Sequence, residues 1–242
     1  KGVSIVGCKV YVTHEPCETC TKFLLQSGVS QVIYLKSYKN KYNSEFLKES
    51  DVIFREFNGL NKDFLFPSLL SAEQCTCEAV ADFKANYIFK GGYNSICDLT
   101  GGLGIDTLAF SSVIPNVIYV ERFADYCWAA NHNFRLLNRN IRVINSDCSD
   151  FLKENICFDA LYIDPARRGE SNKRVFAFAD CEPNVVELLP RMFEVANDVY
   201  IKASPMADIS MSINELKYVC DRYVISYKNE CKELLFRLNK DE

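Results

Sequence analysis

The glycine-rich stretch at residues 98–104 (Asp-Leu-Thr-Gly-Gly-Leu-Gly) constrains the fold of this chain more than any other feature. A short apolar run at 95–97 precedes it, and residues 107–110 (Thr-Leu-Ala-Phe) follow it. This order predicts a strand, a tight turn and a helix. Glycines are needed in such a turn because a ligand lies against the backbone where a side chain would collide. We therefore expect Gly102 and Gly104 to form part of a binding site.

The acid that opens this stretch, Asp98, indicates what kind of ligand is bound. Dinucleotide-binding folds carry a third glycine that lets the helix pack, and they place a pyrophosphate at the helix N-terminus. Thr107 stands at the position of that third glycine. A carboxylate at the end of the strand suits a ligand with an ammonium group and no phosphates. The pattern favours S-adenosylmethionine over NAD.

Strand and helix patterns alternate from residue 95 to the end of the chain. Strands are predicted at 95–100, 117–122, 142–147, 158–164, 198–203, 222–227 and 233–238. Helices are predicted between them, notably at 106–113, 124–137 and 185–196. This alternation is typical of a doubly wound α/β sheet, and the last two strands are close enough to form a hairpin. Seven strands that end in a hairpin are the arrangement of the Rossmann-like class I methyltransferases.

An acid follows each of the first four strands of this sheet. Ligands of such sheets bind at the carboxyl ends of the strands, so four acids there are hard to explain as surface charge. Asp98 is expected to face the methionine ammonium, and Glu121 to accept hydrogen bonds from the ribose hydroxyls. Asp147, with Cys148 beside it, is expected to accept from the adenine amino group. Asp164 falls where the methyl acceptor should lie.

A further helix is predicted before the first of these strands. Residues 71–74 (Ser-Ala-Glu-Gln) form a capping-box pattern, and helical spacing continues to about Ile88. In methyltransferases a helix here often closes over the cofactor, which would turn Gln74, Thr76 and Glu78 toward its methionine end. Simple helix capping explains residues 71–74 equally well. The expected cofactor-binding residues are Gln74, Thr76, Asp98, Thr100, Gly102, Gly104, Glu121, Asp147 and Cys148.

Several motifs in residues 64–238 resemble a known family. They lie at residues 70–75, 98–104, 164–168, 179–183, 202–206 and 229–235. Together they resemble the bacterial class I methyltransferases that carry a THUMP-like C-terminal domain. The resemblance implies S-adenosylmethionine binding and, through the accessory domain of that family, an RNA acceptor. It does not extend to that domain or to the N-terminal helical region of the family.

The motif Asp164-Pro165-Ala166-Arg167 is the expected catalytic site. Amino-group methyltransferases typically read D-P-P-aromatic, and here Arg167 replaces the aromatic ring; a guanidinium can also stack on a base. The D-P-A-R form resembles the RNA uracil-C5 methyltransferases, which place a cysteine nucleophile after strand five. This chain has residues 203–205 (Ala-Ser-Pro) there, so a covalent uracil adduct has no attacking thiolate. We therefore predict methylation of a nitrogen on an RNA base, with Asp164 orienting the acceptor and Pro165 and Arg167 beside it.

The first 58 residues contain a different motif, Pro16-Cys17-x-x-Cys20. A strand is predicted at 7–13, a helix at 17–27 and a second strand at 29–35. Both thiolates would lie on the first helical turn, where the helix dipole favours negative charge. This pattern is typical of half a metal site.

Residues 8–57 resemble the C-terminal half of the zinc-dependent deoxycytidylate deaminases. The matching segments are 11–13, 16–20, 26–29 and 32–34. In that family the two cysteines hold zinc together with the histidine of an upstream H-x-E, whose glutamate is the general acid and base. No H-x-E precedes Cys17, although His14 or Cys8 could supply a third ligand. We expect residues 1–58 to be a deaminase-like fragment with an incomplete zinc site at Cys17 and Cys20 and no deaminase activity, and residues 59–242 to be the methyltransferase domain.

Composition limits the setting of the protein. The chain of 242 residues is 48% apolar, which is enough for a real core, and it has no run of 18 apolar residues that would span a membrane. Its start does not resemble a secretion signal, so we expect the twelve cysteines to be reduced and the protein to be cytoplasmic, without a membrane partner. Trp128 and Phe134 have helical spacing and are expected in the core.

Charge is uneven along the chain. Residues 1–58 carry a net charge of +2 and the rest −6, within a total of −4. The acidic second part offers no obvious surface for long nucleic acid. A basic cluster at Arg135, Arg139 and Arg142, and another at 167–174, fit either solvated surface charge or phosphate contacts.

Three functions fit these observations. An S-adenosylmethionine-dependent methyltransferase is favoured because the acids for the cofactor are all present. A zinc-dependent cytidine or dCMP deaminase is the alternative, and the missing H-x-E counts against it. A protein that binds S-adenosylmethionine without catalysis is the third.

Overall fold

The computed structural model describes residues 4, 6–36, 53–56, 64–68, 75–89, 92–167 and 177–241. The chain divides into two compact units, Lys1–Phe64 and Leu65–Glu242. The boundary expected after residue 58 falls outside the described residues.

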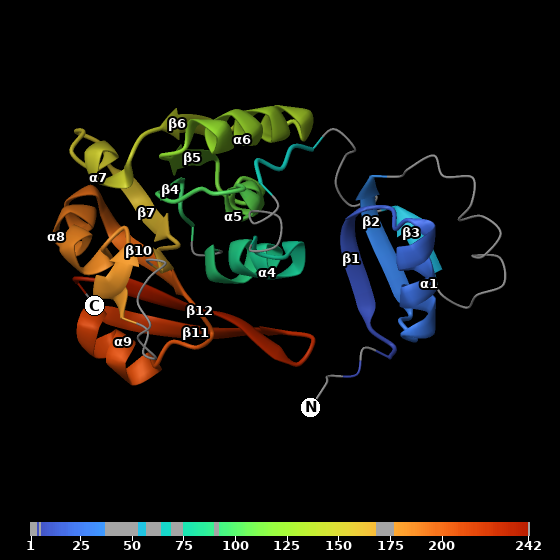
Figure 1. Ribbon diagram of the computed structural model, residues 1–242. Helices are drawn as coiled ribbons and strands as arrows, with labels where there is room; N and C mark the ends of the chain where they lie inside the picture. The colour runs from blue at the N-terminus through green and yellow to red at the C-terminus, as the bar shows by residue number, and fades with distance from the viewer. Residues whose placement is uncertain are drawn as a thin grey trace. The chain divides into compact units, whose positions relative to one another are not determined.

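The N-terminal unit is a small α/β layer (Figure 1). Its described residues form a parallel three-stranded sheet in the order β1-β2-β3, with one helix after the first strand. The elements are β1 Lys9–His14, α1 Glu18–Gln26, β2 Gln31–Lys36 and β3 Ile53–Glu56. Gly28, with a φ of +69°, follows the helix because few other residues adopt the left-handed conformation. The predicted strand, helix and strand are present, and β3 was not predicted.

The described residues of the C-terminal unit form a seven-stranded sheet in the order β11-β12-β10-β7-β4-β5-β6 (Figure 1). The strands β10, β7, β4, β5 and β6 are parallel, and β12 runs antiparallel to both β10 and β11. Their bounds are β4 Ser95–Asp98, β5 Asn116–Glu121, β6 Arg142–Asn145, β7 Phe158–Ile163, β10 Ala196–Ala203, β11 Val219–Tyr227 and β12 Glu230–Asn239. The predicted fold class, including the terminal hairpin, is confirmed.

Helices cover both faces of this sheet. One face packs against α4 Glu78–Phe83, which continues as a π-helical turn at Lys84–Ile88, and against α5 Ile105–Phe110 and α6 Ala124–Leu136. The other face packs against α7 Cys148–Phe151, α8 Val185–Val195 and α9 Ile209–Leu216. Short elements follow β7, namely β8 Ala166–Arg167, a 3₁₀ turn at Phe178–Asp180 and β9 Cys181–Glu182.

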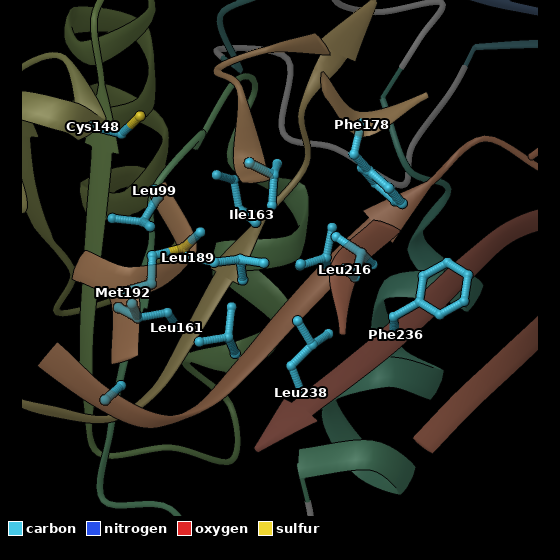
Figure 2. Packing of buried hydrophobic residues seen from close by; sticks show 14 of the residues in the cluster. Leu99, Cys148, Leu161, Ile163, Phe178, Leu189, Met192, Leu216, Phe236 and Leu238 are labelled. Carbon is cyan, nitrogen blue, oxygen red and sulfur yellow. The ribbon is translucent and has the colours of Figure 1, made fainter. Parts of the chain in front are cut away.

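The core on the second face fixes the strand ends from which the site is built. Figure 2 shows Leu161 and Ile163 of β7 together with Leu189 and Met192 of α8, all of them buried. Leu99, the first residue beyond β4, belongs to the same cluster. Burial of such side chains contributes about 1.5–3 kcal/mol each. The glycine turn therefore starts from a rigid base.

The structure corrects three expectations. The helix before β4 begins at Glu78 rather than near residue 71, because residues 75–77 are not helical; residues 71–74 lie outside the described residues. The third predicted strand, 142–147, ends at Asn145, since Asp147 instead caps α7 by accepting a hydrogen bond from the Ser149 backbone N–H at 2.8 Å. Trp128 is 68% exposed on the outer side of α6, whereas Phe134 is buried as expected.

Candidate functional site

A cavity of about 580 Å³ opens at the carboxyl ends of the parallel strands. Its size is ordinary for a small-molecule site, which typically measures about 300–1,000 Å³. Among the predicted residues, those that line it are Thr76, Asp98, Thr100, Gly102, Gly104, Glu121, Asp147, Cys148 and Asp164. Pro165 is buried and does not line the cavity, whereas Gln74 and the side chain of Arg167 lie outside what the structure describes. Predicted residues from five separate segments thus meet at one place.

The three glycines of the turn have different roles. A Cβ on Gly101 would collide with the ring of Tyr119, and one on Gly104 would lie 2.7 Å from Phe134 Cζ. A Cβ on Gly102 would meet only the Thr100 carbonyl oxygen, at 3.8 Å, so this residue leaves open space on the cavity side. Gly102 and Gly104 have φ values of +53° and +83°. Packing therefore explains Gly101, which the sequence analysis did not single out, and Gly104, while Gly102 provides the backbone approach for a ligand.

Asp98 is only 2% exposed at the base of the cavity. Its carboxylate accepts hydrogen bonds from Thr107 Oγ1 at 2.6 Å and from the Thr100 backbone N–H at 3.2 Å. Burial raises the pKa of Asp98 to about 7, even though these hydrogen bonds favour the charged form. A cationic group beside it would stabilise the carboxylate. Thr107, which replaces the third glycine of a dinucleotide site, thus orients this acid.

Glu121 connects the glycine turn to the start of α6. One carboxylate oxygen accepts from the Gly102 backbone N–H at 3.0 Å, and the other accepts from the Phe123 backbone N–H at 2.9 Å. Each oxygen has a second lone pair available for a ligand. The Tyr119 hydroxyl holds the same turn by donating to the Gly102 carbonyl at 2.5 Å. The result is a buried, fixed pair of acceptors at the end of β5.

Asp147 and Cys148 lie together at the beginning of α7. Hydrogen bonds from Ser149, from its hydroxyl at 2.6 Å and its backbone N–H at 2.8 Å, lower the pKa of Asp147. Burial raises the pKa of the Cys148 thiol to about 12, and burial also raises that of Cys75 at the cavity wall. Both thiols are therefore neutral near pH 7, and neither is an activated nucleophile.

Lys202 was not assigned a role from the sequence, yet it dominates the electrostatics around Asp164. Its Nζ donates to Asp164 Oδ2 at 2.7 Å and to Thr76 Oγ1 at 3.0 Å. Burial disfavours its charge, but the carboxylates of Asp164, Asp106 and Glu233 outweigh that cost and raise the pKa of Lys202 well above its ordinary value. The backbone N–H of Asp164 donates to Thr100 Oγ1 at 2.7 Å. This acid is thus held from two sides.

Below this pair lies a buried ion cluster that the sequence analysis also missed. Lys84, which is fully buried, places its Nζ 2.8 Å from Asp106 Oδ1, 2.6 Å from Glu233 Oε1 and 3.0 Å from the Tyr162 hydroxyl. Asp106 Oδ2 in turn accepts from Thr76 Oγ1 at 2.9 Å. Lys84 and Lys202 hold the pKa of Asp106 below its ordinary value although burial opposes the charge. Buried ions are tolerated only when they are paired in this way.

In the N-terminal unit, Cys17 and Cys20 are exposed on the first turn of α1. Hydrogen bonds from the Cys20 backbone and thiol lower the pKa of Cys17, and the same interaction raises the pKa of Cys20. Within the described parts of the chain, no three His, Cys, Asp or Glu residues are grouped to hold a metal ion. The side chain of His14 is not among those that the structure describes. The two thiols do not by themselves fit a closed tetrahedral zinc site.

In comparisons with known proteins, the N-terminal and C-terminal units resemble two different groups of proteins. Residues 1–36 match the family model described as the cytidine and deoxycytidylate deaminase zinc-binding region. The ComE operon protein 2 of Bacillus subtilis is 38% identical over 52 residues, which are 21% of this chain and 28% of that protein. The deoxycytidylate deaminase of enterobacteria phage T2 is 46% identical over 41 residues, which are 16% of this chain and 22% of the phage enzyme.

The C-terminal unit shares its fold with methyltransferases. A solved structure described as a "putative methyltransferase" from Porphyromonas gingivalis W83 has 34% identity and a TM-score of 0.68, covering 75% of this chain and 45% of that one. An S-adenosylmethionine-dependent methyltransferase from Clostridium acetobutylicum has 11% identity and a TM-score of 0.52, covering 71% and 94%. The C-terminal unit therefore has the Rossmann-like fold of methyltransferases, and residues 1–36 are similar to the zinc-binding region of deaminases. The chain spans less than half of the length of the Porphyromonas protein and of the curated relatives it matches.

Helices in the described residues are all too short or too polar to cross a membrane.

Proposed function

We propose that this protein is an S-adenosylmethionine-dependent methyltransferase whose acceptor is a nitrogen of an RNA base. One observation carries the proposal: the buried carboxylates of Asp98 and Glu121 flank the open side of Gly102 in a single cavity. An ammonium group beside Asp98 and two hydroxyls beside Glu121 would satisfy these acceptors. Asp147 stands further along the same wall for an amino group of a base.

S-adenosylmethionine carries the groups that this cavity can accept, and when bound it supplies an electrophilic methyl group on a sulfonium. Thr76, Thr100, Gly104 and Cys148 complete the proposed wall of the cofactor site. The raised pKa of Asp98 supports the proposal, because an acid that is buried near the carboxylates of Asp106 and Asp164 gains from a cationic ligand. The residues present therefore fit the cofactor.

We place the acceptor end of the site at Asp164, and we propose that Pro165 and Arg167, which follow it in the chain, take part. Lys202 fixes the Asp164 carboxylate, whose side chain is 42% exposed, so an acceptor N–H can donate to it. During the proposed transfer the nitrogen–carbon bond forms and the sulfur–carbon bond breaks, and the proton of the nitrogen passes through the Asp164 carboxylate to solvent. Positioning of the two reactants would supply most of the acceleration. The neutral thiols of Cys75 and Cys148 disfavour a covalent route through a cysteine adduct.

We further propose that residues 1–58 form the deaminase-like fragment and residues 59–242 the methyltransferase domain, and that the protein is cytoplasmic. Twelve cysteines without a disulfide support a reducing compartment. The deaminase alternative rests on the match of residues 1–36. Deamination of dCMP by the zinc-loaded chain would favour it over methyl transfer.

The first test is calorimetric titration of the chain with S-adenosylmethionine. We expect saturable binding to the native chain and loss of binding in Asp98→Asn with Glu121→Gln, which keep side-chain size. The matched control is Asp150→Ala with Glu154→Ala, two exposed acids whose loss should leave binding unchanged. Transfer of labelled methyl from the cofactor to cellular RNA, lost in Asp164→Ala, would then show the reaction. No cofactor binding by the native chain would refute the proposed function, and binding without transfer would favour a non-catalytic protein.

A further inference from the structure

The outer side of α6 carries an aromatic and basic surface that the proposed site does not use. Trp128 is 68% exposed, and its ring stacks on His132 with centroids 6.5 Å apart and planes 26° from parallel. Arg135, one turn further along, is also exposed. Residues at spacings of four and seven lie on the same side of a helix. Tryptophan is enriched among the residues that carry most of the binding energy at interfaces.

This surface begins at the cavity. Phe123, 52% exposed, precedes the first turn of α6 and lines the cavity together with Arg122 and Tyr126. The Arg122 guanidinium lies over the Phe123 ring, 4.7 Å from its centroid. From Phe123 to Arg135 a helix rises about 18 Å. Aromatic groups therefore extend from the cavity wall outward along one helix.

The far end of the same surface is positive. Arg135 at the end of α6 and Arg139 just beyond it are exposed, and within the described residues neither forms an ion pair. Asp125 is the one acidic residue within α6, and it lies in the first turn of that helix. The positive charge is thus concentrated away from the cavity, in a unit that is otherwise acidic. A local charge of this sign in an acidic protein indicates an anionic partner.

We propose that Phe123, Trp128, His132, Arg135 and Arg139 form the docking surface for single-stranded RNA. Bases stack on Trp128 and His132, and phosphates contact the two arginines. The strand then reaches the rim of the cavity at Phe123. Single-stranded RNA fits better than a duplex, because only unpaired bases present a free face for stacking. This proposal rests on the proposed function, since it names the surface that would deliver its acceptor.

Trp128 is the only tryptophan of the chain, so intrinsic fluorescence reports directly on this surface. Titration of the full chain with a short single-stranded RNA of mixed sequence is expected to quench that fluorescence to saturation. Inorganic polyphosphate, which has charge but no bases, should bind without comparable quenching. Equal quenching by polyphosphate would overturn the stacking role of Trp128.

Anisotropy of a labelled RNA gives the affinities of the variants. Trp128→Ala is expected to weaken binding about 5- to 100-fold, the usual effect of losing one stacked base. Arg135→Ala with Arg139→Ala should lower the slope of log affinity against log salt by about 1.4, because each lost phosphate contact accounts for about 0.7 with single strands. Tyr218→Ala and Arg222→Ala are the matched controls, since both are exposed and lie by β11 at the opposite edge of the sheet, and they should bind as the native chain does.

Calorimetry with S-adenosylmethionine separates this proposal from the proposed function. Trp128→Ala should keep the native affinity for the cofactor, because Trp128 does not line the cavity. If RNA quenches the Trp128 fluorescence of a chain that does not bind the cofactor, the docking surface is supported and the proposed methyltransferase function is refuted. Cofactor binding without quenching, or native RNA affinity in Trp128→Ala, would overturn the docking surface and leave the methyltransferase standing.

Discussion

Cys17 and Cys20 in the N-terminal unit differ from the acids of the cavity in how many elements support them. The two thiols come from one helical turn and are both exposed. Asp98, Glu121 and Asp164 come from the ends of three strands, and each accepts a hydrogen bond from a residue outside its own strand, namely Thr107, Gly102 and Lys202. Two cysteines that are close in sequence thus supply only half of a metal site. A parallel sheet, in contrast, brings acids that are distant in sequence into one cavity.

The two regions also differ in how charge is balanced. Cys17 and Cys20 compete for one proton, since the hydrogen bond that lowers the pKa of Cys17 raises that of Cys20. In the C-terminal unit, Lys84 and Lys202 are placed against the carboxylates of Asp106 and Glu233, at distances from 2.6 to 4.0 Å. Pairing of opposite charges thus holds the buried side chains of the C-terminal unit in place.

Lys84→Met should have the largest effect, because it leaves two buried carboxylates without their closest cation. Removal of one partner from a buried ion pair typically costs about 3–5 kcal/mol. Urea unfolding of the full chain should show this loss in the transition of the C-terminal unit. Lys153→Met, whose partner Asp150 is exposed, is the control and should leave the transition in place. Equal stability of the two variants would show that the buried cluster is not needed for the fold.

Gly104→Ala should cost about 2–3 kcal/mol, since the added Cβ would meet Phe134 at 2.7 Å and the backbone has a φ of +83°. The affinity for S-adenosylmethionine should fall as well, because the turn lines the cavity. Gly92→Ala is the matched control, with a φ of +91° but nothing within 4 Å of the added Cβ. The stability that Gly92→Ala loses should be limited to the cost of backbone strain, about 1–2 kcal/mol. If both variants lose the same stability, close packing is not what requires Gly104.

Binding of S-adenosylmethionine should weaken as pH falls below about 7, by up to about tenfold per pH unit, because a protonated Asp98 must release its proton to face an ammonium group. Calorimetry between pH 5.5 and 7 would measure this slope, and Asp98→Asn should lack it. Without ligand, the pH dependence of folding stability runs in the opposite direction to that of binding. The folded chain holds the proton of Asp98 more tightly than the unfolded chain does, so the contribution of Asp98 to stability declines as pH rises from about 4 to about 7. An affinity that does not change with pH would show that Asp98 does not face the ammonium group of the cofactor.

The smallest effect is expected in the N-terminal unit. Added zinc should leave the thermal midpoint of the chain unchanged, and Cys17→Ser with Cys20→Ser should respond in the same way. Among the side chains that the structure describes, these two thiols have no third ligand grouped with them, and a tetrahedral zinc site needs four. Alkylation followed by mass spectrometry provides a second readout: Cys17 should react well before buried Cys148. A zinc-dependent rise in the midpoint that needs both cysteines would reveal a complete site and reverse the contrast.

Local patterns in the sequence determined the strands, the glycine turn and the acids that follow the strands. Each depends on neighbours in the chain: apolar runs predict β4, β5 and β7, and the residue after such a run lies at the carboxyl edge of a parallel sheet. The fold class and the position of Asp98 could therefore be predicted. So could the placement of Glu121 and Asp164 in one cavity.

Only the tertiary structure decided which side of a periodic helix is buried and which distant residues form pairs. Trp128 and Phe134 both have helical spacing, but packing of α6 on the sheet buries the second and exposes the first. Lys84, Asp106, Lys202 and Glu233 are up to 149 positions apart, as the numbers 84 and 233 show, and nothing local marks them as partners. Periodicity gives a helix two sides without saying which one meets the core, and ion pairs between strands and helices depend on the three-dimensional packing alone.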